Sequence, residues 1–96
     1  METEFSTTFW SDFSIADAFG ISAIKDTYKR AFNEWKDQYK YLTDLVMVLN
    51  HKCWYWFEHG NQEYSQLYSD LFYEAQDYGY EHLKGEELTY FWKTLD

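Results

Sequence analysis

The sequence predicts an all-α protein, a compact bundle of four or five helices formed by one domain over residues 1–96. Three observations support this prediction. The chain has no proline and only four glycines, so little forces its backbone out of a helix. After residue 20 its apolar residues recur at the three- and four-residue spacing of a helix. Hydrophobic residues make up 46% of the chain, enough for one modest core.

The N-terminal residues, METEFSTTFW, mix polar and aromatic side chains without a helical period. We therefore expect residues 1–12 to be irregular. Ser14 and Asp17 follow in the Ser-x-x-Asp spacing typical of a capping box. They predict a short helix that ends at Gly20.

The next helix is expected over residues 22–40, with Ser22 as its cap and Asp26 near its first turn. Its apolar stripe consists of Ile24, Tyr28, Ala31, Phe32, Trp35 and Tyr39. This spacing is typical of a helix with one face against a core.

A second stripe predicts a helix over residues 42–59. It consists of Leu42, Leu45, Val46, Leu49, Cys53, Trp56 and Phe57. We place the break from the preceding helix between Asp37 and Thr43, with Thr43 as the candidate cap. A single long bent helix is the alternative.

Gly60 ends this helix, and Asn61 can cap a third one over residues 62–84. The short turn predicts an antiparallel helical hairpin over residues 42–84. The third stripe consists of Tyr64, Tyr68, Leu71, Ala75, Tyr78 and His82. Gly79, in mid-helix, indicates either close packing or a bend.

Gly85 separates a last short helix from the third. Glu86 and Glu87 at its start and Lys93 near its end suit the helix dipole. Its expected buried face consists of Leu88, Phe91, Trp92 and Leu95.

No catalytic or metal-binding motif is present. The histidines, His51, His59 and His82, form no Glu-x-x-His or His-Glu-x-x-His pattern. The glycines are isolated, so no phosphate-binding loop exists. Cys53 lies on an apolar stripe and is interpreted as an inert core thiol, and His82 as a packing residue. We expect no enzymatic activity, no cofactor and no metal.

The formal net charge of −9 argues against nucleic acid or an anionic membrane as a direct partner, because both attract cations. It permits a basic protein partner, or it serves solubility alone. A single cysteine indicates a reducing compartment. With no apolar run of membrane length and no signal-peptide pattern, we expect a cytoplasmic protein.

The charge is unevenly distributed along the chain. Residues 53–96 have a net charge of −7 and residues 25–52 a net charge of +2. On a helical wheel for residues 62–84, five acids share an arc of about 60° over roughly 27 Å. This acid row consists of Glu63, Asp70, Glu74, Asp77 and Glu81. Tyr73 and Tyr80 lie beside it, opposite the apolar stripe, so the face resembles a binding surface.

The helix over 22–40 has a complementary lysine stripe within about 60°. It consists of Lys25, Lys29, Lys36 and Lys40. One hypothesis is therefore structural: the two stripes pair within one molecule or a homodimer of a self-assembling accessory protein. It predicts Lys29 and Lys36 within ion-pair reach of acids.

The other hypothesis is mimicry of nucleic acid. Acids three and four residues apart on a helix lie about 5–6 Å from each other, a spacing of the same order as that of phosphates along a DNA strand. Such a row can occupy a groove of lysines and arginines on a host enzyme that handles nucleic acid. Electrostatic steering would make this association fast and sensitive to salt.

The stretch FSIADAFGISAIKDTYKRAFNEWKDQYKYLTDLVMVLNHKCW at residues 13–54, together with HLKGEELTYFW near the C-terminus, resembles small acidic proteins encoded on bacterial mobile elements. The chain is similar in size and charge to phage-encoded anti-CRISPR and anti-restriction inhibitors. This resemblance implies an inhibitor of a host defence protein. It assigns no functional residues.

Overall fold

The computed structural model describes residues 4–95, with side chains from Thr8 to Leu95, and confirms the all-α bundle. Five helices span these residues. They are α1 (Glu4–Phe19), α2 (Ile21–Trp35), α3 (Tyr39–Glu58), α4 (Gln62–His82) and α5 (Glu86–Leu95).

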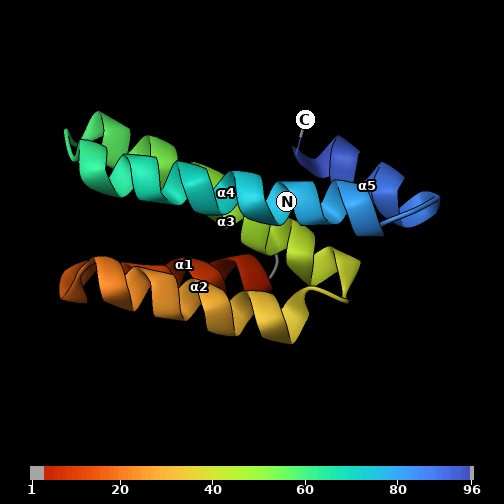
Figure 1. Cartoon of the computed structure of the whole chain (residues 1–96), viewed down its shortest axis with the longest axis horizontal. Coiled ribbons are helices and arrows are strands. Elements are labelled where there is room, and N and C mark those ends of the chain that lie inside the picture. The colour runs from red at the N-terminus through yellow and green to blue at the C-terminus, as the bar shows by residue number, and fades with distance from the viewer. Residues whose placement is uncertain (1–3, 96) are drawn as a thin grey trace.

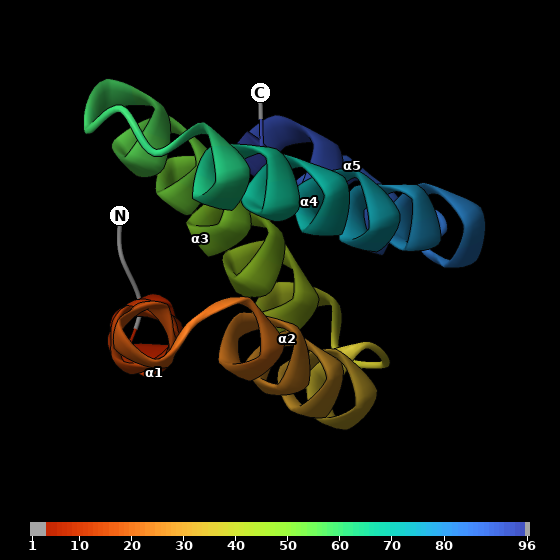
Figure 2. The ribbon, with the colours of Figure 1, turned by 60° about the vertical axis from the view of Figure 1, so that its left-hand side comes forward.

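The five helices form two hairpins, α1–α2 and α3–α4, and the short helix α5 packs on the second hairpin. α1 and α2 form one layer, α3 and α4 form the next, and α5 folds back beyond them (Figure 1). α3 is the central helix, because it packs against each of the other four. Figure 2 shows it passing behind α4 from the α2 side of the molecule toward the α3–α4 turn. The Cα radius of gyration, 12.7 Å, is close to the roughly 12.5 Å expected for a compact chain of this length.

The hydrophobic core is centred on α3. Its buried apolar side chains are Leu42, Leu45, Val46, Val48 and Leu49. α1 adds Phe9, Phe13 and Ala16, and α4 adds Tyr68, Leu71 and Ala75. The apolar stripes read from the sequence of α3 and α4 therefore face each other, as the hairpin prediction requires.

The expectation of an irregular N-terminus is wrong for residues 4–12, which belong to α1; residues 1–3 lie outside the described part of the chain. Phe9, Phe13 and Ala16 are buried at a helical spacing. The exposed Ile15 and Phe19 spread apolar residues around the helix, which hides that period in the sequence. Packing against α3, rather than propensity, stabilises α1.

The predicted caps in this region are also wrong. Ser14 and Asp17 lie inside α1 and Ser22 inside α2. α2 has no side-chain cap and no acid in its first turn, so Asp26 does not have the expected position. Gly20 does end α1, as predicted; its φ of +113° is a conformation that glycine adopts readily, and α2 follows at once.

Residues 36–38 separate α2 from α3, so the alternative of one long helix is excluded. Gln38 has extended backbone angles, φ −114° and ψ 101°. Thr43 lies within α3, where its hydroxyl donates to the Tyr39 carbonyl at 2.6 Å, so it is not a cap. The rings of Trp35 and Tyr41 meet across the corner with centroids 4.8 Å apart.

The hairpin over 42–84 is confirmed, with ends close to the predicted ones. Gly60 has a φ of +79°, and the Asn61 side chain accepts a hydrogen bond from the Tyr64 amide at 3.0 Å. His82, interpreted from the sequence as a packing residue on the apolar stripe, is exposed, but its ring stacks on that of Tyr78 and its Nδ1 lies 2.9 Å from the Tyr78 carbonyl oxygen.

The expected buried face of α5 is partly wrong. Phe91 is fully buried, and Leu88 and Leu95 pack against the core in part, but Trp92 is 53% exposed. Phe91 lies directly over Gly79 of α4, where a Cβ atom would come within 2.7 and 2.9 Å of two of its ring atoms. Gly79 therefore permits close packing of α5, and α4 continues through it as a helix.

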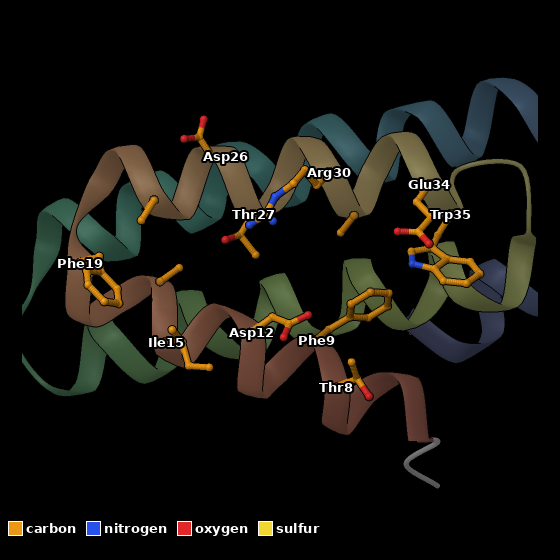
Figure 3. Close-up of a pocket in the computed structure, with 13 residues that line it drawn as sticks. Thr8, Phe9, Asp12, Ile15, Phe19, Asp26, Thr27, Arg30, Glu34 and Trp35 are labelled. Atoms are coloured by element: carbon orange, nitrogen blue, oxygen red, sulfur yellow. The ribbon is translucent and has the colours of Figure 1, made fainter.

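The outer side of the α1–α2 hairpin has a groove of about 590 Å³ between the two helices (Figure 3). Of the described helices, none combines the length and apolar character that crossing a bilayer requires.

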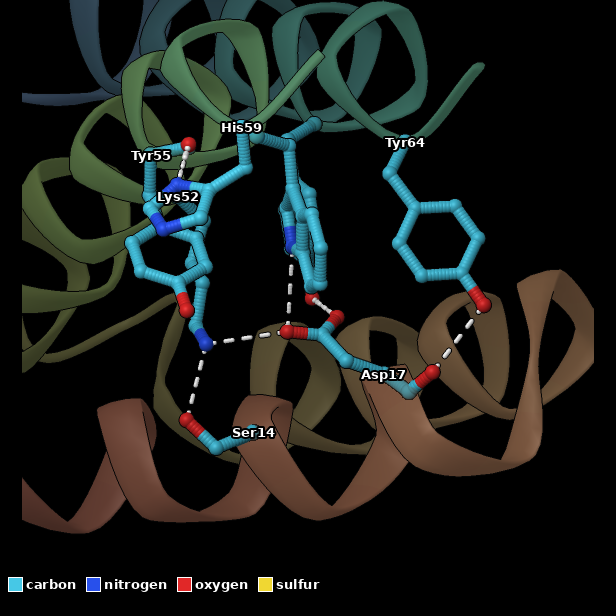
Figure 4. A network of polar contacts seen from close by, with 8 residues as sticks. Ser14, Asp17, Lys52, Tyr55, His59 and Tyr64 are labelled. Atoms are coloured by element: carbon cyan, nitrogen blue, oxygen red, sulfur yellow. Dashed lines mark hydrogen bonds and ion pairs between the residues drawn. The ribbon is translucent and has the colours of Figure 1, made fainter. Parts of the chain in front are cut away.

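A buried polar network joins α1 to α3 and α4 (Figure 4). Asp17 of α1 accepts hydrogen bonds from Lys52 at 2.9 Å and from the Trp56 indole at 3.1 Å. The Tyr68 hydroxyl donates to the other carboxylate oxygen of Asp17. The Lys52 ammonium also donates to Ser14 at 2.8 Å. The Asp17 and Lys52 side chains are 7% and 2% exposed, so α1 is attached by a desolvated ion pair.

Aromatic rings enclose the ammonium of Lys52. It lies 4.1 Å from the ring centroid of Trp10 and 5.4 Å from that of Tyr55, within the range of cation–π attraction. Burial, followed by the hydrogen bond to Asp17, raises the pKa of the Tyr68 phenol, so Tyr68 stays protonated, and a donor, well above neutral pH. Every charged group of the network thus has a partner, as buried charges require.

Replacing Asp17 by alanine is expected to lower the free energy of unfolding by about 3–5 kcal/mol, because it leaves the buried Lys52 without its counter-charge. The Lys52→Met variant is expected to lose less, since Trp56 and Tyr68 still donate to Asp17. Urea unfolding followed by circular dichroism measures both. Asp12→Ala, an exposed acid of the same helix, is the control, with an expected change within about 0.5 kcal/mol. A similarly small change for Asp17→Ala would contradict the structural role.

Gly79→Ala is expected to destabilise the protein although alanine is the better helix former. The propensity gain is about 1 kcal/mol, but overpacking against Phe91 costs typically 1–3 kcal/mol. The same urea assay should show a net loss, with Asp77→Ala on the exposed face of α4 as a matched control. A gain in stability for Gly79→Ala would show that Phe91 does not lie against α4.

Candidate functional site: the acidic face of α4

All five members of the acid row lie on α4 and are exposed. They are Glu63, Asp70, Glu74, Asp77 and Glu81. α4 is one uninterrupted helix of 21 residues, so the five carboxylates project from a rigid rod. The rigid backbone fixes the spacing of the five Cα atoms, so only the acidic side chains themselves have to be ordered on binding.

The core stripe of α4 sets the direction of the acid row. Tyr68, Leu71 and Ala75 are buried against the rest of the bundle. At about 100° per residue the acids lie roughly 80–140° around the helix from Tyr64, within the arc that points away from α3. The packing that buries this stripe therefore presents the acids to solvent together.

One member of the row lies close to α2. The Tyr28 hydroxyl is buried and lies close to Glu74, so that burial, followed by the negative charge of Glu74 and hydrogen bonding to it, raises the pKa of this phenol. Further along, the Tyr78 hydroxyl donates to Asp37 at 3.4 Å. Glu74 of the acid row thus lies toward the edge of α4 that neighbours α2. Asp70 accepts a hydrogen bond from Gln66 at 2.9 Å.

The predicted lysine stripe is only partly assembled. Lys25 and Lys29 are exposed on α2, but the chain turns before Lys40, which belongs to α3. The Lys36 ammonium lies 6.0 Å from the ring centroid of Tyr78. Within residues 8–95, neither Lys29 nor Lys36 has an acid within 4 Å; the ion pair found there joins Lys52 and Asp17. The two stripes therefore do not neutralise each other within this chain through direct ion pairs.

The two tyrosines beside the acid row have different surroundings. Tyr73 is 57% exposed and its ring meets the neighbouring Phe72 edge-on, with centroids 5.2 Å apart. Tyr80 is 42% exposed and its ring meets Phe91 of α5, with centroids 5.5 Å apart. Tyr73 is thus free to anchor a partner, whereas Tyr80 also supports α5.

The candidate metal ligands of the described residues are dispersed over the fold. Among them, no three histidine, cysteine, aspartate or glutamate side chains come together in a way that could hold a metal ion. Cys53 is half-buried with its sulfur 3.6 Å from the Ser65 hydroxyl. The Asp17–Lys52 pair is almost closed to solvent and forms part of the packing between α1 and α3.

The buried network was not predicted, although the sequence contained a signal for it. Lys52 lies three residues after Leu49 and four before Trp56, both on the apolar stripe of α3. A lysine on a core-facing arc requires a buried partner. The identity of that partner, Asp17, could not be read from the sequence, because 35 residues separate the two.

Comparisons with known proteins add no relative. The chain matches no protein-family model, no curated protein and no solved structure.

Proposed function

We propose that this protein is a non-enzymatic inhibitor that covers a basic, nucleic-acid-binding surface of another protein with the acidic face of α4. The observation that supports the proposal is the exposure of all five acids on one arc of one helix. Together with its resemblance to phage-encoded inhibitors, this favours a host enzyme that handles nucleic acid, of the restriction or CRISPR type, as the target.

The charge spacing fits such a surface approximately. Five carboxylates over roughly 27 Å correspond to one charge per 5–7 Å of helix axis. A DNA strand has one phosphate per about 3.4 Å of its axis. The acid row is therefore about half as dense as one DNA strand, so it can satisfy a subset of the lysines and arginines in a groove. Tyr73 adds a rigid, exposed aromatic anchor next to the acids.

The acids are also placed to attract a cationic partner from a distance. Between Cys53 and Leu83 the chain contains no lysine or arginine, and no ion pair within the described part of the chain involves the acid row. A uniform negative surface raises the association rate with a positive one, and salt reduces that effect. The complex should therefore form quickly and weaken as ionic strength rises.

A second candidate function is self-assembly through the same charges. Lys25 and Lys29 are exposed on α2, so they are available to the acid row of another copy. In that case the protein would be a structural accessory whose stripes pair across a homodimer. Its oligomeric state would depend on salt in the same way as binding to a basic partner, but no second protein would be needed.

Changing Asp70, Glu74 and Asp77 together to lysine is expected to weaken binding to the target roughly 10- to 100-fold, at about 0.5–1 kcal/mol for each exposed charge. The tagged protein is used to capture its target from a bacterial lysate, with elution by a salt gradient and competition by DNA. Affinity for the captured protein is then measured directly. Helix content, followed by circular dichroism, should be unchanged because all three side chains are exposed.

The matched control changes Glu58, Glu86 and Glu87 to lysine, three exposed acids outside α4. It alters the net charge equally, so general electrostatics would weaken both variants alike. Equal loss, or retained binding by the acid-row variant, would contradict the proposal. Recovery of the protein alone as a salt-sensitive dimer would favour self-assembly.

A further inference from the structure

The groove on the outer side of the α1–α2 hairpin is separate from the acid row. It has a volume of about 590 Å³ and runs along the space between the two helices (Figure 3). Its floor is apolar, formed by the buried Phe9 and Ala16 and the half-buried Ala31 and Trp35. No other described helix covers this side, since α3, α4 and α5 lie beyond the opposite side of the hairpin (Figure 1).

Two large apolar side chains stand at one end of the groove. Ile15 is 61% exposed and Phe19 is 79% exposed. Both line the groove and lie near the α1–α2 turn (Figure 3). Neighbouring exposed apolar side chains beside an apolar groove are typical of a protein interaction site.

The shape of the groove favours a helix as its occupant. Three alanines, Ala16, Ala23 and Ala31, line it from both helices, and small residues let a third helix approach closely. An extended peptide would find no free backbone donors here, because the backbone of α1 and α2 is already bonded within each helix. From Ala23 to Trp35 the groove spans roughly 18 Å, the length of a helix of about 12 residues.

The charges at the rim indicate the chemistry of that helix. Asp12, Asp26 and Glu34 line the groove together with a single cation, Arg30, so the rim has an excess of negative charge. An apolar stripe flanked by lysine or arginine complements both the floor and the rim. This pattern corresponds to the recognition of an amphipathic helix in a groove.

We propose that the α1–α2 groove binds a basic amphipathic helix of a partner protein, with Ile15 and Phe19 as its apolar anchors. The site does not depend on the acid row. On a helical wheel of α2, Lys25 and Lys29 lie about 100–140° from Ile24, whereas Asp26, Arg30 and Glu34 lie about 200–280° from it. The lysines of α2 thus separate the groove from the acidic face of α4, so a partner could occupy either surface alone.

The test uses a fluorescent 18-residue peptide of leucine and lysine arranged as an amphipathic helix, with anisotropy as the readout. The comparison peptides are a shuffled sequence of the same composition and a leucine–glutamate peptide with the same pattern. The groove predicts that the basic amphipathic peptide binds at least about tenfold more tightly than either. If the shuffled peptide bound equally tightly, charge attraction alone would explain the binding, and the proposal would be overturned.

Variants locate the binding site of the peptide. Ile15→Ser with Phe19→Ser should weaken peptide binding at least about tenfold. Trp54→Ser with Phe57→Ser removes another pair of exposed apolar side chains, from α3, and should leave peptide binding within about twofold of the wild type. Circular dichroism confirms that both variants remain helical. Equal effects of the two pairs would contradict the groove as the site.

Two further outcomes separate this inference from its alternatives. If reversing Asp70, Glu74 and Asp77 abolishes peptide binding while the Ile15 and Phe19 variant retains it, the groove proposal fails and the acidic face stands. If the wild-type protein is a dimer by light scattering and the Ile15 and Phe19 variant is a monomer, a second copy fills the groove, which overturns the partner proposal.

Discussion

The buried contact between Asp17 and Lys52 is the constraint on which the arrangement of the two hairpins depends. It joins the last turn of α1 to α3, and Tyr68 and Trp56 extend it to both helices of the second hairpin. A desolvated ion pair is specific rather than strongly stabilising, because a shifted register would leave charges buried without partners. The network therefore favours one way of placing α1 on the α3–α4 hairpin.

Both candidate binding surfaces follow from that placement. With α1 and α2 packed on α3 and α4, the outer side of the first hairpin remains open as the groove. The same packing turns the core stripe of α4 inward and leaves its acids in solvent. Gly79 and Phe91 bring α5 close to α4, on the side where Tyr80 rather than the acid row makes the contact.

Both surfaces favour a basic partner, but they would bind it through different interactions. The acid row offers solvated carboxylates, which contribute mainly to the association rate and to selectivity against acidic partners. The groove offers apolar area, whose burial gives affinity that salt reduces little. A basic protein with an amphipathic helix could use both, and the lysines of α2 between them would then limit its orientation.

The sequence by itself determined the all-α class, the α3–α4 hairpin and the acidic face of α4. These features are local: a helical period, the Gly60–Asn61 turn and the side chains of one helix decide them. The tertiary structure alone decided α1, the corner at residues 36–38 and the partner of Lys52. α1 has no clear apolar period and the corner has no glycine or proline, so their conformations depend on contacts with α3. The groove likewise lies between two helices, and the sequence pattern of neither helix specifies how the two pack together.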